Sequence, residues 1–209
     1  MFGWEFPPHN SGGLGTACFG LTKALGERNA DITFVLPKQV GVSSDFVRIM
    51  FADTVPGVTL RSVDAALSPY MTATLYEKFR RGLESVIYGA SLMEEVLRYA
   101  MQARRIAREE AYDVIHAHDW LSFPAGVEAK KASGKPLVVH VHATEFDRTG
   151  GHAINQDVYA VEWEGMHAAD RIVAVSNFTK NIIISHYGVD PARVTVVHNG
   201  VDPSTCRKS

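Results

Sequence analysis

The sequence predicts an α/β fold built on a doubly wound parallel sheet, and three observations support this prediction. Short β-rich runs alternate with amphipathic stretches along most of the 209 residues. Runs such as Leu137–Val141 are continuously apolar, which is typical of parallel strands buried on both faces. With 46% hydrophobic residues the chain can bury a full core, and no linker, repeat or low-complexity tract divides it. We therefore expect one domain over residues 1–202, followed by a short tail, 203–209.

Each element of this fold follows from a local pattern. The apolar segment Met1–Phe6 is expected to be a strand that ends at a proline pair, and a glycine cluster then begins a helix, Leu14–Glu27. Ser91–Glu110 is the clearest amphipathic helix, with its apolar residues on one stripe. The other expected strands are Ile32–Leu36, Phe46–Phe51, Val58–Leu60, Val114–Ala117, Leu137–Val141, Ile172–Val175 and Val194–Val197, and the other expected helices are Pro69–Arg81, Pro124–Ala132, Asp157–Ala169 and Asn177–Tyr187.

Composition excludes several classes of function. The formal net charge of −2 gives no electrostatic case for binding nucleic acid or a membrane surface. Cys18 and Cys206 have no metal-type spacing and indicate no disulfide framework, so we expect a cytoplasmic protein. No apolar run approaches the ~20 residues of a transmembrane helix, and no signal peptide is visible. Both ends of the sequence lead us to expect a fragment of a longer protein.

The glycine cluster at the first strand-to-helix junction predicts an anion site. Gly12, Gly13 and Gly15 let the main chain approach a ligand closely, and the helix N-terminus behind them offers N–H groups with a partial positive charge. Phosphate is the expected guest. The spacing is not the dinucleotide fingerprint G-x-G-x-x-G, and the lysine of a Walker loop is missing. A tight turn without a ligand remains the alternative.

Polar residues collect where the later strands end. In open parallel sheets, ligands bind outside the carboxyl ends of the strands. The residues that follow four of the expected strands are His118-Asp119, His142 to Glu145, Ser176-Asn177 and His198-Asn199. With the glycine cluster, five strand ends on one rim carry groups that can bind a ligand.

Among these residues, His118 and His142 are the best candidates for direct chemistry, because an imidazole donates, accepts and changes charge near neutral pH. Ser176 has the type and place of a helix N-cap, and Asp119 suits either a cap or a ligand contact. We expect His116, which points away from Ala117, to pack inside with a backbone partner.

Two common site types are not expected at these strand ends. The histidines are separated by whole β-α units and form no H-x-x-x-H pair, which argues against a zinc site. The absence of G-x-S-x-G argues against an α/β-hydrolase. The Asn199-Gly200 pair has the simple turn as its alternative.

Five motifs in order carry a family resemblance over nearly the whole chain, from residue 1 to 202. The sequence resembles the N-terminal domain of retaining GT-B glycosyltransferases of family four, close to the glycogen-synthase-like members of bacteria and archaea. The motifs are Phe2–Gly15 (F-G-W-E-F-P-P-H-N-S-G-G-L-G), His116–Trp120 (H-A-H-D-W), His140–Arg148 (H-V-H-A-T-E-F-D-R), Ala174–Thr179 (A-V-S-N-F-T) and His198–Asp202 (H-N-G-V-D).

This resemblance implies a two-domain enzyme with its active site in the cleft between two Rossmann-like halves. Residues 1–202 are then the acceptor-side half, and residues 203–209 lead toward a C-terminal donor domain that is not in this sequence. The activity implied is transfer of a hexose from a nucleotide diphosphate sugar to a hydroxyl acceptor, such as a glucan, with retention of configuration. We expect this chain alone to be inactive, because half of the donor site is missing.

The resemblance also assigns the site residues. The glycine loop faces the donor diphosphate, and His142 reaches the transferred sugar near the reacting carbon. Glu145 and Arg148 lie toward the acceptor, and no metal or other cofactor is expected. The implied catalytic residues are His142 and Asp119, and the implied donor-binding residues are Gly12, Gly13, Gly15, His118 and Asn199.

The expected mechanism is front-side attack through an ion-pair-like state, because no well-placed carboxylate pair suggests double displacement and Glu145 is the only nearby candidate for it. The chain also departs from glycogen and starch synthases, which carry a lysine two places before the paired glycines and an aspartate after the loop. Here the place of the lysine holds Asn10 or Ser11, depending on the alignment, and the place of the aspartate holds Thr16. The identities of the donor and the acceptor therefore stay open. The alternatives are a sugar-nucleotide epimerase or hydrolase on the same scaffold and a non-catalytic carbohydrate-binding module.

Overall fold

A computed structural model describes residues 1–9, 12–38, 41, 44–52 and 92–200. All strand pairs among these residues that form ladders are parallel. One sheet has the order β3-β4-β5-β6 and a second pairs β1 with β2. The strands are β1 (Thr33–Leu36), β2 (Arg48–Phe51), β3 (Ile115–His118), β4 (Leu137–Val141), β5 (Arg171–Ala174) and β6 (Val194–Val196).

The N-terminal segment joins these two sheets. Phe2 forms parallel bridges to both Val35 of β1 and Ala117 of β3. Its N–H donates to the carbonyl oxygen of His116 at 2.7 Å, and its own carbonyl accepts from the N–H of His118 at 3.0 Å. The strand predicted for Met1–Phe6 is therefore a short central segment with single bridges, and the result is one continuous parallel arrangement.

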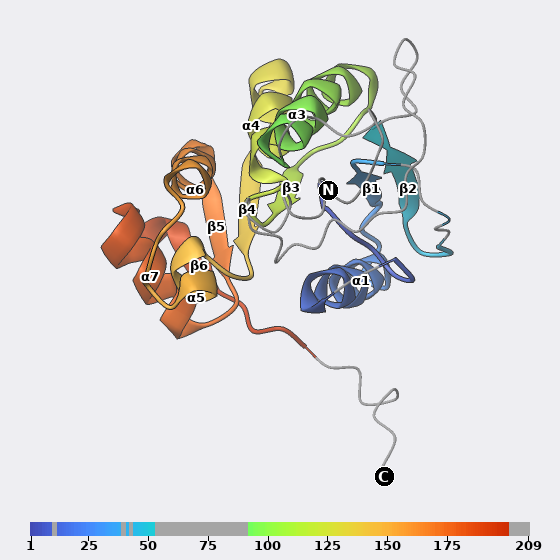
Figure 1. Ribbon diagram of the computed structural model, residues 1–209. Coiled ribbons are helices and arrows are strands. Elements are labelled where there is room, and N and C mark those ends of the chain that lie inside the picture. Colours follow the sequence, from blue (N-terminus) through green and yellow to red (C-terminus); the bar gives the residue numbers. More distant parts are fainter. Residues whose placement is uncertain (10–11, 39–40, 42–43, 53–91, 201–209) are drawn as a thin grey trace.

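Helices lie on both sides of the strands, as the doubly wound prediction requires. The main helices are α1 (Gly13–Gly26), α3 (Leu92–Glu109), α4 (Phe123–Ser133), α6 (Gln156–Ala168) and α7 (Asn177–Tyr187). In Figure 1, α3 and α4 lie side by side on one side of β3, and α1 lies on the other side.

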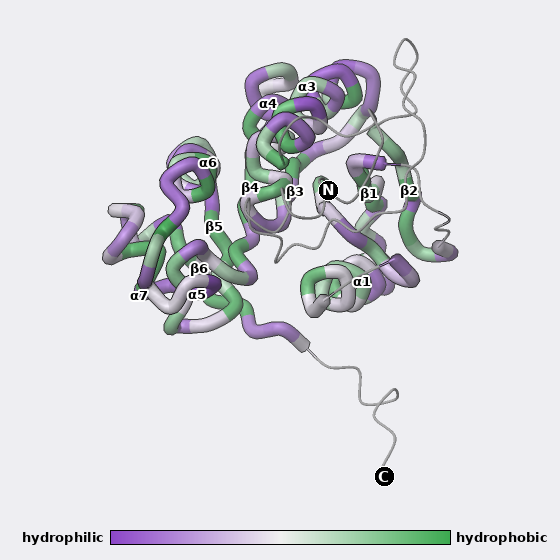
Figure 2. Tube along the Cα trace, viewed as in Figure 1, coloured by the Kyte–Doolittle hydropathy of each residue, from purple (hydrophilic) through white to green (hydrophobic). Residues whose placement is uncertain are grey.

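Alternation along β1 divides the core between these two sides. Phe34 and Leu36 belong to a small cluster with Leu14 and Cys18 of α1. Val35 belongs instead to the large cluster that also contains the buried residues of α3 and α4. Figure 2 shows the amphipathic character of α3, whose turns change between hydrophobic and hydrophilic. β1 is thus covered by apolar side chains on both faces, which explains its continuously apolar sequence.

The helix boundaries have identifiable causes. The Ser176 hydroxyl accepts from the N–H of Thr179 at 3.0 Å, which confirms its prediction as the N-cap of α7. Asn155 caps α6 in the same way. Gly134 and Gly188 end α4 and α7 with φ of +71° and +67°, the left-handed region that favours glycine.

Two short elements were not expected from the sequence: the helix α5 (Glu145–Thr149) and the 3-10 helix η2 (Pro191–Arg193). The strand expected at Val58–Leu60 and the helix expected at Pro69–Arg81 lie outside the described residues. Among the residues that the structure describes, no helix has both the length and the apolar character needed to cross a membrane.

Candidate active site

The central pair of strands, β3 and β4, brings the predicted histidines together. Their register places His118 directly opposite His140, and side chains two apart on one strand share a face of the sheet. His116, His118, His140 and His142 therefore form one group, here called the histidine cluster, on the side of the sheet that faces Phe34 and α1.

Ring contacts run through the whole cluster. The ring centroids of His116 and His118 lie 4.3 Å apart, as do those of His140 and His142. The Nδ1 atom of His118 lies 3.2 Å from Nε2 of His142, so one of the two imidazoles donates a hydrogen bond to the other. His116 was expected to have a backbone partner. Its Nε2 atom is buried but has no hydrogen-bond partner among the described residues.

Burial keeps these imidazoles neutral. Desolvation lowers the pKa of His142 to about 4 and, with a contribution from His142, the pKa of His140 to about 3. Desolvation and the neighbouring histidines lower the pKa of His118 well below its usual value. At neutral pH, His142 therefore acts as a hydrogen-bonding group without charge.

Asp119 positions the backbone of the loop that carries His142. Its Oδ1 atom accepts from the N–H of His142 at 2.7 Å and from the N–H of Ala143 at 3.4 Å. Asp119 itself has a φ of +59°, a left-handed conformation that directs its buried carboxylate across the strand ends. Burial raises the pKa of this carboxyl to about 6 despite the opposing effect of Arg148. The side chain of Asp119 thus holds the main chain of His142 and Ala143 in place.

The glycine loop begins α1 as expected, but one of its amides is already used. Gly12 is the N-cap in an extended conformation, and Gly13 opens the helix beside empty space large enough for a side chain. The N–H of Gly15, however, donates to Oε1 of the buried Glu5 at 2.9 Å. The Gly15 amide, which the sequence assigns to the donor phosphate, is thus held by an internal carboxylate in this structure.

The side chains of Glu145 and Arg148, which the resemblance places toward the acceptor, pair with each other in this structure. Both side chains are buried, with relative exposures of 5% and 8%, and they pair with each other at 3.2 Å. Nη1 of Arg148 donates to the carbonyl oxygen of Ala143 at 2.8 Å. Both residues lie on the short helix α5, and both contact Glu162 of α6, through the side chain of Arg148 and the N–H of Glu145.

Two residues that sequence analysis missed complete this group. Glu162 of α6 accepts from Nη2 of Arg148 and from the hydroxyl of Tyr187 on α7, and it also accepts from the N–H of Glu145 at 3.1 Å. We call Glu145, Arg148, Glu162 and Tyr187 the arginine brace. The available signal was a glutamate within an otherwise apolar helical face, but its partner could not be read from spacing.

Asn199 follows β6 on the same edge of the sheet and is exposed. Its neighbour His198 is tied to β5, because its Nδ1 lies 3.0 Å from the carbonyl oxygen of Val175. Asn199 does not contact the histidine cluster through any hydrogen bond among the described residues, and Asp202 lies outside them.

Two sets of described residues, which draw on the histidine cluster and on Cys18 of α1, bring metal-ligating atoms close together. His116, His118 and His140 have ligand atoms within 4.8 Å of one another, and so do Cys18, His118 and His142. The neighbouring parallel strands β3 and β4 thus bring together histidines that whole β-α units separate in the sequence. The spacing of the histidines alone did not predict this group of possible metal ligands.

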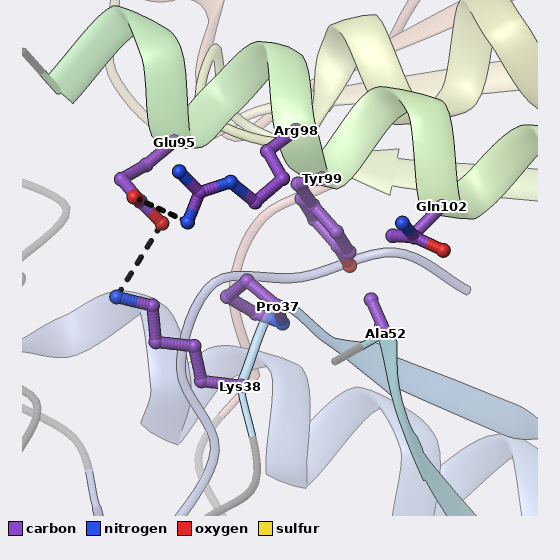
Figure 3. Close-up of a pocket in the computed structure, with 7 residues that line it drawn as sticks. All are labelled: Pro37, Lys38, Ala52, Glu95, Arg98, Tyr99 and Gln102. Carbon is purple, nitrogen blue, oxygen red and sulfur yellow. Dashed lines mark ion pairs between the residues drawn. The ribbon is translucent and has the colours of Figure 1, made fainter. Parts of the chain in front are cut away.

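Away from the histidine cluster, a hollow lies between α3 and the residues that follow β1 and β2 (Figure 3). Glu95 pairs there with both Lys38, at 3.4 Å, and Arg98, at 3.0 Å, so each cation that lines the hollow already has an internal partner. We therefore place the candidate site at the histidine cluster. The lining residues of the hollow are Pro37, Lys38, Ala52, Glu95, Arg98, Tyr99 and Gln102.

Comparison with known proteins places the chain among glycosyltransferases. The Glycosyltransferase Family 4 model matches residues 11–205. Glycogen synthase of Mycobacterium tuberculosis is 27% identical over 207 residues, which cover 97% of this chain and 48% of that protein. D-inositol 3-phosphate glycosyltransferase of Kribbella flavida is 33% identical over 156 residues, which cover 72% of this chain and 34% of that protein. The chain spans about half the length of the glycogen synthase that it matches.

Solved structures show the same fold. Anabaena HepE in complex with UDP and glucose has a TM-score of 0.55 at 16% identity, over 96% of this chain and 44% of that chain. An Escherichia coli trehalose-6-phosphate structure bound with UDP-2-fluoro glucose has a TM-score of 0.56 at 15% identity, over 97% of this chain and 49% of that chain.

Proposed function

Because this chain belongs to glycosyltransferase family 4, we propose that the whole protein transfers a hexose from a nucleotide diphosphate sugar to a hydroxyl acceptor with retention of configuration. One observation carries the proposal: His118 and His142 meet at the carboxyl ends of adjacent parallel strands, against the second turn of the helix that the glycine loop begins. A sugar-binding imidazole and an anion-binding helix end are thus close together.

The start of α1 supplies the phosphate side of the proposed site. Charge grows on the diphosphate as the glycosidic bond breaks, and N–H groups aimed at that charge stabilise the transition state. The open space beside Gly13 leaves room for such a group to approach the main chain. The Gly15 amide reaches a donor only if Glu5 gives up its hydrogen bond.

His142 supplies the sugar side. Its neutral imidazole accepts or donates a hydrogen bond to a sugar hydroxyl, and its main chain is held by Asp119 at 2.7 Å. A fixed hydrogen-bonding group near the reacting carbon keeps the sugar in a reactive geometry. We assign His142 to binding and orientation, and Asp119 to positioning of His142.

The burial of Glu145 favours front-side attack over double displacement. Glu145 was the nearby carboxylate that sequence analysis considered, and its oxygens accept from Arg148 and from the N–H of Asn155 at 3.2 Å. A carboxylate held in this way does not reach a sugar in the cleft. The leaving diphosphate is then the natural base for the incoming hydroxyl, so no protein nucleophile is required.

A second domain completes the proposed site, because the chain covers about half of the glycogen synthase to which it is similar. The names of the two relatives suggest two acceptor classes, a glucan or an inositol phosphate. The epimerase, hydrolase and binding-module alternatives are less favoured, because the family model and the relatives are all glycosyltransferases.

The test uses the full-length protein with UDP-, ADP- and GDP-glucose, each with and without glycogen or inositol 3-phosphate. We expect nucleotide release that depends on the acceptor, together with labelled glucose in the product. Acceptor-independent release without incorporation would indicate a hydrolase. Absence of release with every donor would contradict the proposal and favour a binding module.

A further inference from the structure

We propose that His116, His118 and His140 bind one divalent transition-metal ion, with zinc as the best match. The site lies within the histidine cluster, on the α1 side of β3 and β4. It was not expected from the sequence, where these histidines are spaced unlike a zinc motif. The proposal rests on strand register, on buried nitrogen atoms without partners, and on the chemistry of the three side chains.

The register of the two strands builds the site. His116 and His118 are two residues apart on β3 and share a face, and His140 pairs directly with His118 across the ladder. The ligand atoms of all three lie within 4.8 Å of one another. Tetrahedral zinc, with Zn–N bonds of about 2.0–2.1 Å, places its nitrogen ligands about 3.4 Å apart. The three nitrogens therefore have to approach one another by at most about 1.4 Å to reach one ion.

Each of the three side chains carries a buried nitrogen that needs a partner. Nε2 of His116, Nε2 of His118 and both ring nitrogens of His140 have no hydrogen-bond partner among the described residues. His118 is fully buried and His140 is 5% exposed. Buried polar atoms are satisfied in the great majority of proteins, and each exception needs a cause. A metal ion satisfies one nitrogen on each ring at once.

Three imidazoles also select the class of metal. Neutral imidazole suits Zn, Cu, Fe and Ni, whereas Mg²⁺ and Ca²⁺ prefer oxygen ligands. Three histidines hold the catalytic zinc of carbonic anhydrase, where the fourth position stays open to water. The same donor set here leaves a fourth position for a water molecule or another small ligand.

The ion would also fix the proton on His118. With Nε2 on the metal, the proton stays on Nδ1, which lies 3.2 Å from Nε2 of His142 and donates to it. His142 is then left with Nδ1–H as its donor. This consequence, unlike the site itself, rests on the proposed function, because it sets the tautomer of the residue assigned to the sugar.

The test measures zinc binding by the chelator-treated full-length protein, in competition with a chromogenic zinc indicator. Wild type is expected to bind one equivalent. His116→Asn and His140→Asn are each expected to bind at least ~100-fold more weakly, since each removes a direct ligand. The matched control His152→Asn changes an exposed histidine and is expected to bind as wild type. Substitution by Co²⁺ should give the intense visible bands of a tetrahedral site in wild type and in His152→Asn, but not in the two ligand variants.

Absence of stoichiometric zinc in wild type would overturn the proposal, and so would unchanged binding in both His116→Asn and His140→Asn. Loss of binding in Cys18→Ser, with binding kept in those two variants, would also overturn it, because the ion would then belong to the set Cys18, His118 and His142. Circular dichroism checks the fold of each variant. If His140→Asn fails to fold, the half-buried His116 decides the outcome. A protein that binds zinc without transferring sugar, or the reverse, separates this proposal from the proposed function.

Discussion

The histidine cluster and the arginine brace lie on neighbouring segments of the chain but treat buried polar groups in opposite ways. In the brace, Glu162 accepts from Arg148, from Tyr187 and from the N–H of Glu145, so its carboxylate is fully used. In the cluster, both ring nitrogens of the buried His140 have no partner among the described residues. The same loop, after β4, connects the two regions.

This difference indicates that the histidine cluster binds a ligand and that the arginine brace supports the structure around it. A buried network whose members are all satisfied makes its surroundings rigid, whereas unpaired buried groups mark a place that a ligand completes. Arg148 holds the carbonyl of Ala143, and Asp119 holds the N–H of His142. The brace therefore fixes the loop after β4 at Ala143, and this helps to hold the neighbouring His142 in position.

Breaking the brace should give the largest change in stability. Arg148→Met leaves Glu145 and Glu162 buried without their cation, and removal of one partner from such a pair costs about 3–5 kcal/mol. The matched control is Arg104→Met, because Arg104 is half exposed and lies 3.7 Å from Glu128, a type of pair worth below about 1 kcal/mol. Urea unfolding of both variants measures the difference. Equal losses would contradict the assignment of a supporting role to the brace.

The cluster should instead make stability depend on pH. The pKa of His140 is about 3 in the folded protein and near 6.5 when unfolded, so the unfolded chain binds the extra proton between these values. This contribution to stability is complete above about pH 6.5 and is lost as the pH falls toward 3. Each such histidine adds a slope of about 1.4 kcal/mol per pH unit. Asp119, with its pKa raised to about 6, acts in the opposite sense.

Comparison of wild type with His140→Asn isolates one of these contributions. In buffer with a chelator, the variant should show a dependence on pH that is flatter by about 1.4 kcal/mol per unit between about pH 6 and 4, because it lacks one titrating imidazole. The effect of Asp119 cancels in the comparison. Urea unfolding at several pH values provides the measurement, and parallel slopes would show that His140 is not desolvated as the structure has it.

The sequence was sufficient to predict the parallel sheet and the strand ends that carry His118, Asp119 and His142. These follow from local patterns, since apolar runs and capping residues are visible without knowledge of contacts. The helix α5 was missed although its capping box, Thr144 with Asp147, can be read from the sequence. A helix this short adds little periodicity to that signal.

The contacts between elements were beyond sequence reasoning. Two H-x-H patterns show that His116 shares a face with His118, and His140 with His142, but only the register of β3 and β4 brings the pairs together. In the same way, the burial of Glu145 and Arg148 could not be predicted, because their partners Glu162 and Tyr187 come from other helices. Alternation along one strand is local, whereas the pairing of strands and of buried charges is set by tertiary packing.

The account depends most directly on His142, whose imidazole is assigned to the transferred sugar. The deciding measurement is the turnover of sugar transfer and the affinity for the free nucleotide in the full-length protein and its His142→Ala variant. We expect turnover to fall by about 10²–10³, the usual loss for one transition-state hydrogen bond, while nucleotide affinity stays nearly unchanged. Turnover close to that of wild type, or a parallel loss of nucleotide affinity, would contradict the assignment.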